Sequence, residues 1–293
     1  MNNKIIGPVI PLPTPFTVEY KVDYAALDSY VKFLVKNGIR NVMTTVGTSR
    51  YNLLTTDEIK NVNETVVNAS KGKAISIVAN PITGGTSSAI EFAQHSKKIG
   101  ADFLLRIFPE RYYGDNNTYA FFETVAEAAD ISILIHEMPM RNGLGGGTVQ
   151  YSLPLLERLL EIKNIAGFKE ESLDMEYSNT IVEKFSSKAE MIGAGGGMSR
   201  YFLRDHKRES KTFLGGIGNF IPELELTFFE LMSHGKIEDA GKIVNEIEIS
   251  YFNDVVPMGW HPSLKAALHL KNFLPEYERP PMKQVAGAEL KKL

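Results

Sequence analysis

The chain of 293 residues contains no cysteine and one tryptophan, and its charges almost cancel. Without cysteine the protein has no disulfide bond and no thiolate nucleophile, and this composition fits a reducing compartment. A formal net charge of −3 gives no basic surface of the kind that binds nucleic acid. No apolar run approaches the roughly 18 residues that suggest a membrane-spanning helix.

The residues that are present have the proportions of an ordinary globular protein. Hydrophobic residues make up 43% of the chain and charged residues 23%. The segment Met1–Lys4 leads directly into a strand-like stretch and does not resemble a signal peptide, so we expect a cytoplasmic location. The length fits one large domain or two small ones.

Short apolar runs alternate with amphipathic stretches along most of the chain. We expect strands at Ile5–Pro11, Asn41–Val46, Ala74–Ala79, Asp102–Phe108, Ile131–His136, Ile165–Lys169, Glu190–Ala194 and Thr212–Leu214. We expect the helices that follow them at Tyr24–Lys36, Thr56–Asn68, Ser87–Ile99, Thr118–Ala129, Leu153–Glu161, Met175–Phe185, Met198–Lys207 and Pro222–Ser233. Because parallel strands need crossover connections, this order predicts an α/β protein built as a (β/α)8 barrel.

The competing fold is an open, doubly wound sheet. Such a sheet usually has a glycine-rich phosphate motif after its first strand, and this chain has the proline-rich turn 11–15 there. Further helices are expected at Ile237–Ser250 and Ser263–Asn272. We therefore expect residues 1–235 to form the barrel and residues 236–293 a helical extension packed on it, as one structural unit.

Lys169 is the strongest candidate for a reactive residue. It closes the apolar run Ile165–Phe168, and a strand buried on both faces has such a continuous apolar run. At the carboxyl end of a barrel strand the amine enters the region where these barrels have their active sites. A desolvated amine there can lose its proton and attack a carbonyl group. The alternative, from spacing alone, is a surface lysine at the end of a strand.

The turn Gly47-Thr48-Ser49 is a candidate anion site at the end of the second strand. Its two hydroxyls and free backbone N–H groups suit a carboxylate. The alternative is a simple helix-capping turn, since Thr and Ser are common there. Arg50, the next residue, adds a cation at the mouth that would meet a second acidic group on the substrate.

In their order along the chain, the segments resemble the dihydrodipicolinate synthase / N-acetylneuraminate lyase family of class I aldolases. The matching motifs are Pro8–Phe16, Gly47-Thr48-Ser49, Gly100-Ala101-Asp102 with Pro109, Pro139-x-Arg141-x-Gly143 and Gly167-Phe168-Lys169-Glu170. The resemblance covers essentially the whole chain. It implies a Schiff-base-forming lyase, of the aldolase or dehydratase kind, that acts on pyruvate or another 2-oxo acid through Lys169.

The resemblance also implies roles for the residues around that lysine. Thr48 and Ser49 would hold the 2-oxo acid carboxylate, and one hydroxyl would relay protons. His136 stands where the family has the tyrosine of Tyr-Asn-x-Pro, and histidine can do acid–base work near neutral pH. The alternative for His136 is a hydrogen-bonded histidine that lines the barrel.

Three more positions follow from the resemblance. Arg141 would hold the carboxylate of a second substrate, for which a guanidinium is suited, or would form a structural salt bridge. Tyr113, in the pair Tyr112-Tyr113, would reach into the site of a neighbouring subunit and join its proton relay as a catalytic residue, or would simply pack at an interface. Ile217 lies in the segment Gly215–Asn219, whose backbone flanks the 2-oxo acid in the family, and small residues there leave room for a bulky substrate.

The resemblance implies a small-molecule substrate and a homo-oligomer (dimer or tetramer), and we expect no cofactor. We also expect no metal site, because the six histidines share no ligand-type spacing. Two other functions stay open. One is dihydrodipicolinate synthase proper. The other is a homologue that binds a 2-oxo acid without turnover, which the unusual residues His136, Arg50 and Tyr51 suggest.

Overall fold

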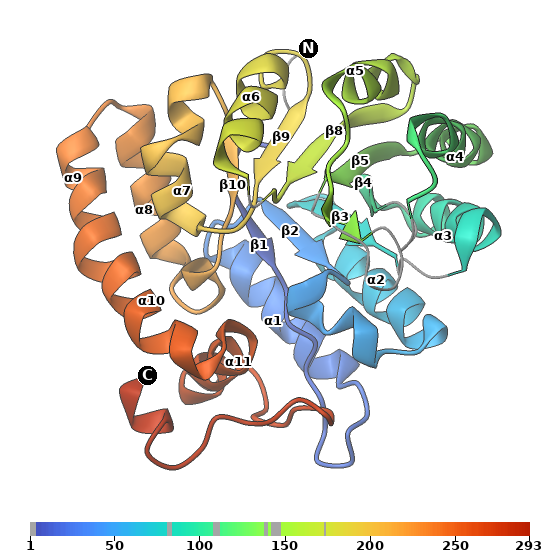
Figure 1. Cartoon of the computed structure of the whole chain (residues 1–293). Helices are drawn as coiled ribbons and strands as arrows, with labels where there is room; N and C mark the ends of the chain where they lie inside the picture. The colour runs from blue at the N-terminus through green and yellow to red at the C-terminus, as the bar shows by residue number, and fades with distance from the viewer. Residues whose placement is uncertain (1–3, 81–83, 108–111, 138–139, 142–147, 173) are drawn as a thin grey trace.

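Eight parallel strands close into a barrel in the computed structural model, which describes residues 4–80, 84–107, 112–137, 140–141, 148–172 and 174–293 (Figure 1). The order around the barrel is β1-β10-β9-β8-β5-β4-β3-β2. The strands are β1 Gly7–Pro11, β2 Asn41–Thr44, β3 Ile75–Ala79, β4 Phe103–Arg106, β5 Ser132–Glu137, β8 Ile165–Glu170, β9 Glu190–Gly193 and β10 Thr212–Leu214. The predicted barrel is confirmed, and the open sheet is excluded.

Helices surround the barrel on its outer side (Figure 1). They are α1 Tyr24–Lys36, α2 Thr56–Ser70, α3 Gly85–Ile99, α4 Asp115–Ala128, α5 Leu153–Glu161, α6 Met175–Phe185, α7 Gly197–Leu203, α8 Pro222–Ser233, α9 Ile237–Lys242, α10 Ile249–Val255 and α11 Trp260–Leu270. Side chains set several of the starting points. Asp23 accepts a hydrogen bond from the N–H of Ala26 before α1, and Thr55 and Glu58 form a capping box before α2.

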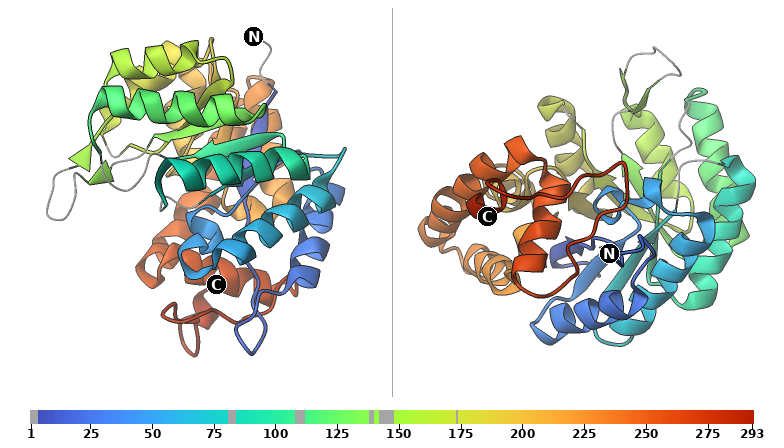
Figure 2. Two further views of the ribbon diagram at one scale, coloured as in Figure 1. Left: turned by 90° about the vertical axis from the view of Figure 1, so that its right-hand side faces the viewer. Right: turned by 90° about the horizontal axis from the view of Figure 1, so that it is seen from below.

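A two-stranded arm was not expected from the sequence. β6 (Met140–Arg141) pairs antiparallel with β7 (Thr148–Val149), and the arm projects beyond the ring of helices (Figure 2). Each of its strands has two residues. Such short strands are too brief for a pattern of apolar and polar residues to reveal them.

Along each strand, side chains point alternately into the barrel interior and toward the surrounding helices. Val9, Met43, Ile77, Leu105 and Leu134 belong to one buried cluster that fills the barrel. Residues of opposite parity pack instead against the helices, in two further clusters. Because side chains alternate across a strand, the same period decides which polar side chains at the strand ends enter the barrel.

The chain beyond α8 packs on the first third of the sequence. Arg279 donates hydrogen bonds to the Tyr20 and Leu53 carbonyls and forms an ion pair with Glu58. α9 and α10 are joined by a single π-helical segment, Ile243–Glu248. In the parts of the chain that are described, no helix combines the length and the hydrophobicity needed to cross a membrane.

Candidate active site

Lys169 lies inside the barrel near the carboxyl end of β8. Gly167 and Lys169 lie on the same face of this strand, whereas Phe168 packs under the helices; Glu171 comes directly after the strand ends. The Lys169 residue is 3% exposed. In the parallel pairing of β5 with β8, His136 is the direct neighbour of Lys169, so both side chains enter the barrel at the same level.

Lys169, His136 and Glu171 form a three-way contact. Lys169 Nζ lies 2.7 Å from His136 Nε2, and this nitrogen lies 2.7 Å from Glu171 Oε2. Lys169 Nζ also forms an ion pair with Glu171 Oε2. The ammonium of Lys169 donates to the Glu171 carboxylate. His136 Nε2 either accepts from this ammonium or donates to the carboxylate, depending on which ring nitrogen carries the proton.

The surroundings set the protonation of the two partners of Lys169. Burial lowers the pKa of His136 below its ordinary value, the Lys169 charge lowers it further, and the Glu171 carboxylate acts in the opposite direction. Burial alone would raise the pKa of Glu171, but the Lys169 ammonium and the His136 hydrogen bond outweigh burial and hold it well below its usual range. Near pH 7 the histidine is therefore neutral and the carboxylate is ionised.

An internal cavity of about 260 Å³ opens beside this cluster. Its described lining includes, besides the cluster, Thr45, Val46, Gly47, Thr48, Tyr51, Ala79, Asn80, Leu105, Ile107, Leu214 and His261. Thr48 belongs to the short helix η1 (Gly47–Ser49) that follows β2. Within the described residues, the N–H groups of Gly47 and Thr48 have no hydrogen-bond acceptor, so they and the Thr48 hydroxyl are available to an anion.

The next two residues have other contacts. Ser49 is fully buried, and its hydroxyl donates to the Leu12 carbonyl at 2.5 Å. The expected cation at the mouth, Arg50, is absent from that position: its side chain is fully buried, forms an ion pair with Glu278 and donates to the His261 carbonyl at 2.7 Å. The expectation was wrong because the partner comes from the distant C-terminal segment, which covers this arginine.

The other three predicted positions are spread around the site. Tyr113 is 63% exposed on the single chain, whereas Tyr112 is hydrogen-bonded to Asp115. The backbone of Arg141 lies in β6, and its side chain is outside the described residues. Ile217 begins the short helix η4 (Ile217–Asn219), and its side chain is buried in the core, so only its backbone can face the site.

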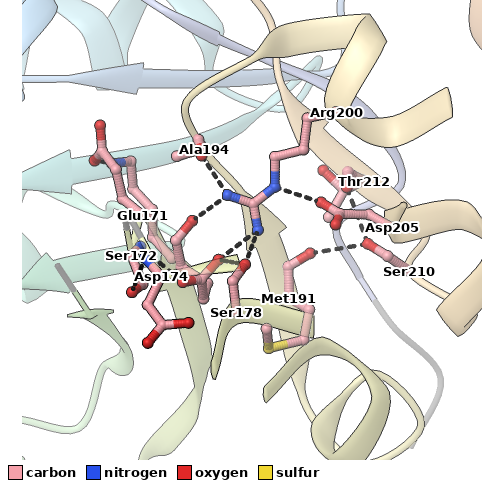
Figure 3. Close-up of polar contacts among 12 residues, drawn as sticks. Glu171, Ser172, Asp174, Ser178, Met191, Ala194, Arg200, Asp205, Ser210 and Thr212 are labelled. Atoms are coloured by element: carbon pink, nitrogen blue, oxygen red, sulfur yellow. Dashed lines mark hydrogen bonds and ion pairs between the residues drawn. The ribbon is translucent and has the colours of Figure 1, made fainter. Parts of the chain in front are cut away.

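Arg200 of α7 holds the end of β8 in place (Figure 3). Its guanidinium forms ion pairs with Glu170 and with Asp205, and it donates to the Ser178 hydroxyl and the Ala194 carbonyl. Glu170 also accepts from the N–H of Ser172 at 2.7 Å. The backbone on both sides of Glu171 is thereby fixed, and with it the direction of the Glu171 side chain into the barrel.

A second cavity, of about 350 Å³, adjoins the first at the ends of β9 and β10. Thr48, Glu171, Leu214 and His261 line both cavities, and the rest of the described lining is Pro11, Gly195, Gly196, Gly197, Gly215, Gly216, Phe252, Val256 and Trp260. Across the described residues, no three His, Asp or Glu side chains gather in a way that could hold a metal ion.

Polar residues of the site that were not expected from the sequence include Thr45, Asn80, Glu171 and His261. The position of Glu171 could have been predicted from the sequence. It stands two residues after Lys169, and every second residue of a strand points to the same face. His261 comes from α11, about 90 residues later in the chain than Lys169. Burial and the nearby Arg50 charge lower its pKa to about 4, and no local pattern connects it to the barrel.

Residues 4–293 match the model of the dihydrodipicolinate synthetase family. An uncharacterised DapA-like lyase of Thermococcus onnurineus is 28% identical over 282 residues, which are 91% of this chain and 89% of that protein.

Solved structures that share the fold include the following two. The N-acetylneuraminate lyase of Mycoplasma synoviae superposes with a TM-score of 0.84 at 24% identity, over 98% of this chain and 95% of that one. The dihydrodipicolinate synthase of Aquifex aeolicus gives the same TM-score, identity and coverage. The chain belongs to the dihydrodipicolinate synthetase family of class I aldolase-type lyases.

Proposed function

We propose that this protein is a Schiff-base-forming lyase, of the aldolase or dehydratase kind, that acts on pyruvate or another 2-oxo acid through Lys169. The observation that carries the proposal is the position of the Lys169 amine. It is almost fully buried, faces an internal cavity and lies 2.7 Å from a neutral imidazole nitrogen. An amine in such surroundings can be deprotonated and can attack a carbonyl carbon.

The three-way contact provides a route for releasing that amine. Lys169 passes a proton to His136, and the Glu171 carboxylate stabilises the imidazolium that results. The free amine attacks C2 of the 2-oxo acid, and the C2 oxygen takes up protons and leaves as water. Overall, one ammonium and one ketone give one protonated imine and one water. The imine then accepts the electron pair of a C3–H or C3–C4 bond as that bond breaks.

The carboxylate of the 2-oxo acid would bind at the turn after β2. The Thr48 hydroxyl and the N–H groups of Gly47 and Thr48 are the available donors there. Ser49 would support this turn through its bond with the Leu12 carbonyl, and the backbone at Ile217 would flank the acid from the end of β10. Arg141 is proposed as a contact for the far end of the substrate.

We further propose a homo-oligomer (dimer or tetramer) in the cytoplasm, in which Tyr113 of one copy completes the site of another. The exposure of this tyrosine, 63%, supports the proposal. Sedimentation of the wild-type protein and of Tyr113→Ala tests it. A monomeric wild-type protein with full activity would contradict it.

The function is tested with pyruvate alone, because the imine labilises the protons on C3. We expect the wild-type protein to exchange the pyruvate methyl protons for deuterium in D2O, followed by proton NMR. Binding of pyruvate, 2-oxobutanoate and a 2-oxo-3-deoxy sugar acid without exchange of any of them would contradict the proposal and favour the homologue without turnover.

A further inference from the structure

If the first cavity holds a 2-oxo acid bound to Lys169, the second cavity is in a position to bind part of a second substrate. In the aldol direction, C3 of the bound acid forms a bond with the carbonyl carbon of an aldehyde. Thr48, Leu214 and His261 line both cavities, so the second cavity offers space for a group attached to that carbonyl carbon. The lining of the second cavity therefore indicates which group the aldehyde carries.

Two buried glutamates occupy backbone donors that a phosphate or carboxylate would otherwise use at this end of the barrel. Glu248 accepts from the N–H groups of Met198 and Ser199, at 2.8 and 2.6 Å, where α7 begins. Glu225 accepts from the N–H of Gly216 at 2.7 Å. Both glutamates are almost completely buried. The N–H groups of Met198, Ser199 and Gly216 are therefore already occupied by side chains of this chain and are not free to bind an anionic substrate group.

The charge of the second cavity also disfavours an anionic group. Of its described lining residues, Glu171 is the one that is ionised near pH 7, because a pKa of about 4 keeps His261 neutral. A second carboxylate in this space would lie near that of Glu171, and the described lining offers it no cation. Like charges that share one cavity repel each other, which disfavours an anionic group beside Glu171.

The wall of the second cavity away from Lys169 is aromatic and aliphatic. Trp260, the only tryptophan in the chain, meets Phe252 edge to face with ring centroids 5.4 Å apart. Val256, which is 62% exposed, also lines this cavity. A β-carbon at Gly216 would lie 2.9 Å from Trp260 Cζ2, so the glycine is what allows the indole to pack against the backbone. This wall presents flat apolar surface and few hydrogen-bonding groups.

We propose that the second cavity binds a flat, uncharged aryl group carried by the aldehyde that the enzyme joins to, or releases from, the 2-oxo acid. This inference rests on the proposed Schiff-base function and adds the class of the second substrate. The space is sufficient, since a cavity of about 150 Å³ already holds benzene. The enamine carbon C3 attacks the aldehyde carbon, the aldehyde oxygen takes up a proton, and hydrolysis of the imine releases a 4-hydroxy-2-oxo acid.

Three aldehydes test the inference on the wild-type protein with pyruvate. Benzaldehyde and 4-carboxybenzaldehyde differ only by a carboxylate, and glyceraldehyde replaces the ring by hydroxyls. Product formation is followed by mass spectrometry, and kcat/KM is measured for each aldehyde. We expect benzaldehyde to exceed both others by about tenfold or more. A higher kcat/KM for 4-carboxybenzaldehyde or glyceraldehyde would overturn the inference.

Variants locate the effect in the second cavity. Trp260→Ala should lower the ratio of the benzaldehyde to the glyceraldehyde kcat/KM by roughly threefold to tenfold, and Phe252→Leu should lower it in the same direction. The matched control is Phe273→Ala, which removes an aromatic ring that packs on Phe33 outside both cavities. An equal change of the ratio in the control and in both cavity variants would contradict the proposal.

The two proposals fail in different ways. Exchange of the C3 protons needs no aldehyde, so its absence from pyruvate, 2-oxobutanoate and the 2-oxo-3-deoxy sugar acid alike refutes the Schiff-base function. Exchange together with a preference for the charged or hydroxylated aldehyde refutes only the assignment of the aryl group.

Discussion

Two lysines are buried to almost the same degree, and their surroundings differ. Lys169 is 3% exposed and Lys265 is 1% exposed. Lys169 faces a cavity beside His136 and Glu171. Lys265 lines neither of the two cavities at the carboxyl end of the barrel. Its amine donates to the Thr14 carbonyl at 2.8 Å.

The comparison shows that burial and a lowered pKa are not enough to make a lysine a nucleophile. Burial lowers the pKa of Lys265 to about 8; Glu278 opposes this effect and Arg50 adds to it. The amine also lies 5.1 Å from the centroid of the Phe16 ring. A substrate cannot reach it there. Access to a cavity and a neighbour that can carry the proton distinguish Lys169.

The largest expected effect comes from removing the proposed nucleophile. Lys169→Arg keeps the positive charge but offers a guanidinium, which does not deprotonate in proteins. Exchange of the pyruvate methyl protons should fall by on the order of 10³-fold or more. Lys265→Arg is the matched control and should retain exchange. The reverse pattern, with loss of exchange only in Lys265→Arg, would contradict the assignment.

The buried charges around Lys265 should matter for stability. Glu278 pairs with Arg50 and lies 4.0 Å from Lys265. Glu278→Gln leaves both cations buried without their carboxylate, and the free energy of unfolding should fall by about 3 kcal/mol. Urea titration followed by Trp260 fluorescence measures it.

Lys265→Met should lower the free energy of unfolding less, by about 1 to 2 kcal/mol, because the ion pair of Arg50 with Glu278 remains. A larger loss of unfolding free energy in Lys265→Met than in Glu278→Gln, measured by the same titration, would contradict the idea that the Glu278 carboxylate stabilises both cations.

The next effect concerns the proton carrier beside Lys169. His136→Gln fills a similar volume but cannot accept a proton near pH 7. We expect proton exchange on pyruvate to slow by about 10²-fold, while the imine can still be trapped by borohydride. An unchanged exchange rate would mean that His136 only lines the barrel.

The smallest expected effect is a change in pH dependence. His136 must be neutral to accept a proton, and its pKa is below the ordinary value because burial, and next the Lys169 charge, disfavour its charged form. The exchange rate should therefore fall on the acid side of that lowered pKa. Glu171 raises the His136 pKa, so Glu171→Gln should move this fall to lower pH. A shift to higher pH, measured by exchange rates across the acid range, would contradict the charge assignment.

The sequence was sufficient for the barrel and for the position of Lys169. Both depend on local signals, namely apolar runs of strand length, amphipathic stretches between them, and a lysine where a run ends. The observed bounds of α1, α5, α6 and α8 equal those expected. His136 also follows from local pattern, because it ends the strand next to that of Lys169.

The parts that were missed depend on contacts between distant residues. Arg50 pairs with Glu278, which lies 228 positions later in the chain, so its immediate neighbours gave no sign that it would be covered. His261 reaches the site from α11 for the same reason. Glu171 is different: its parity with Lys169 was visible, and a stricter use of the two-residue period of a strand would have found it.

The most direct test of the account is to find which lysine is modified when the wild-type protein is treated with pyruvate and borohydride. Peptide mapping by mass spectrometry covers both buried lysines in one digest. The account predicts a reduced pyruvate adduct on Lys169 and none on Lys265. An adduct on Lys265, or an unmodified Lys169 in protein that exchanges pyruvate protons, would contradict it.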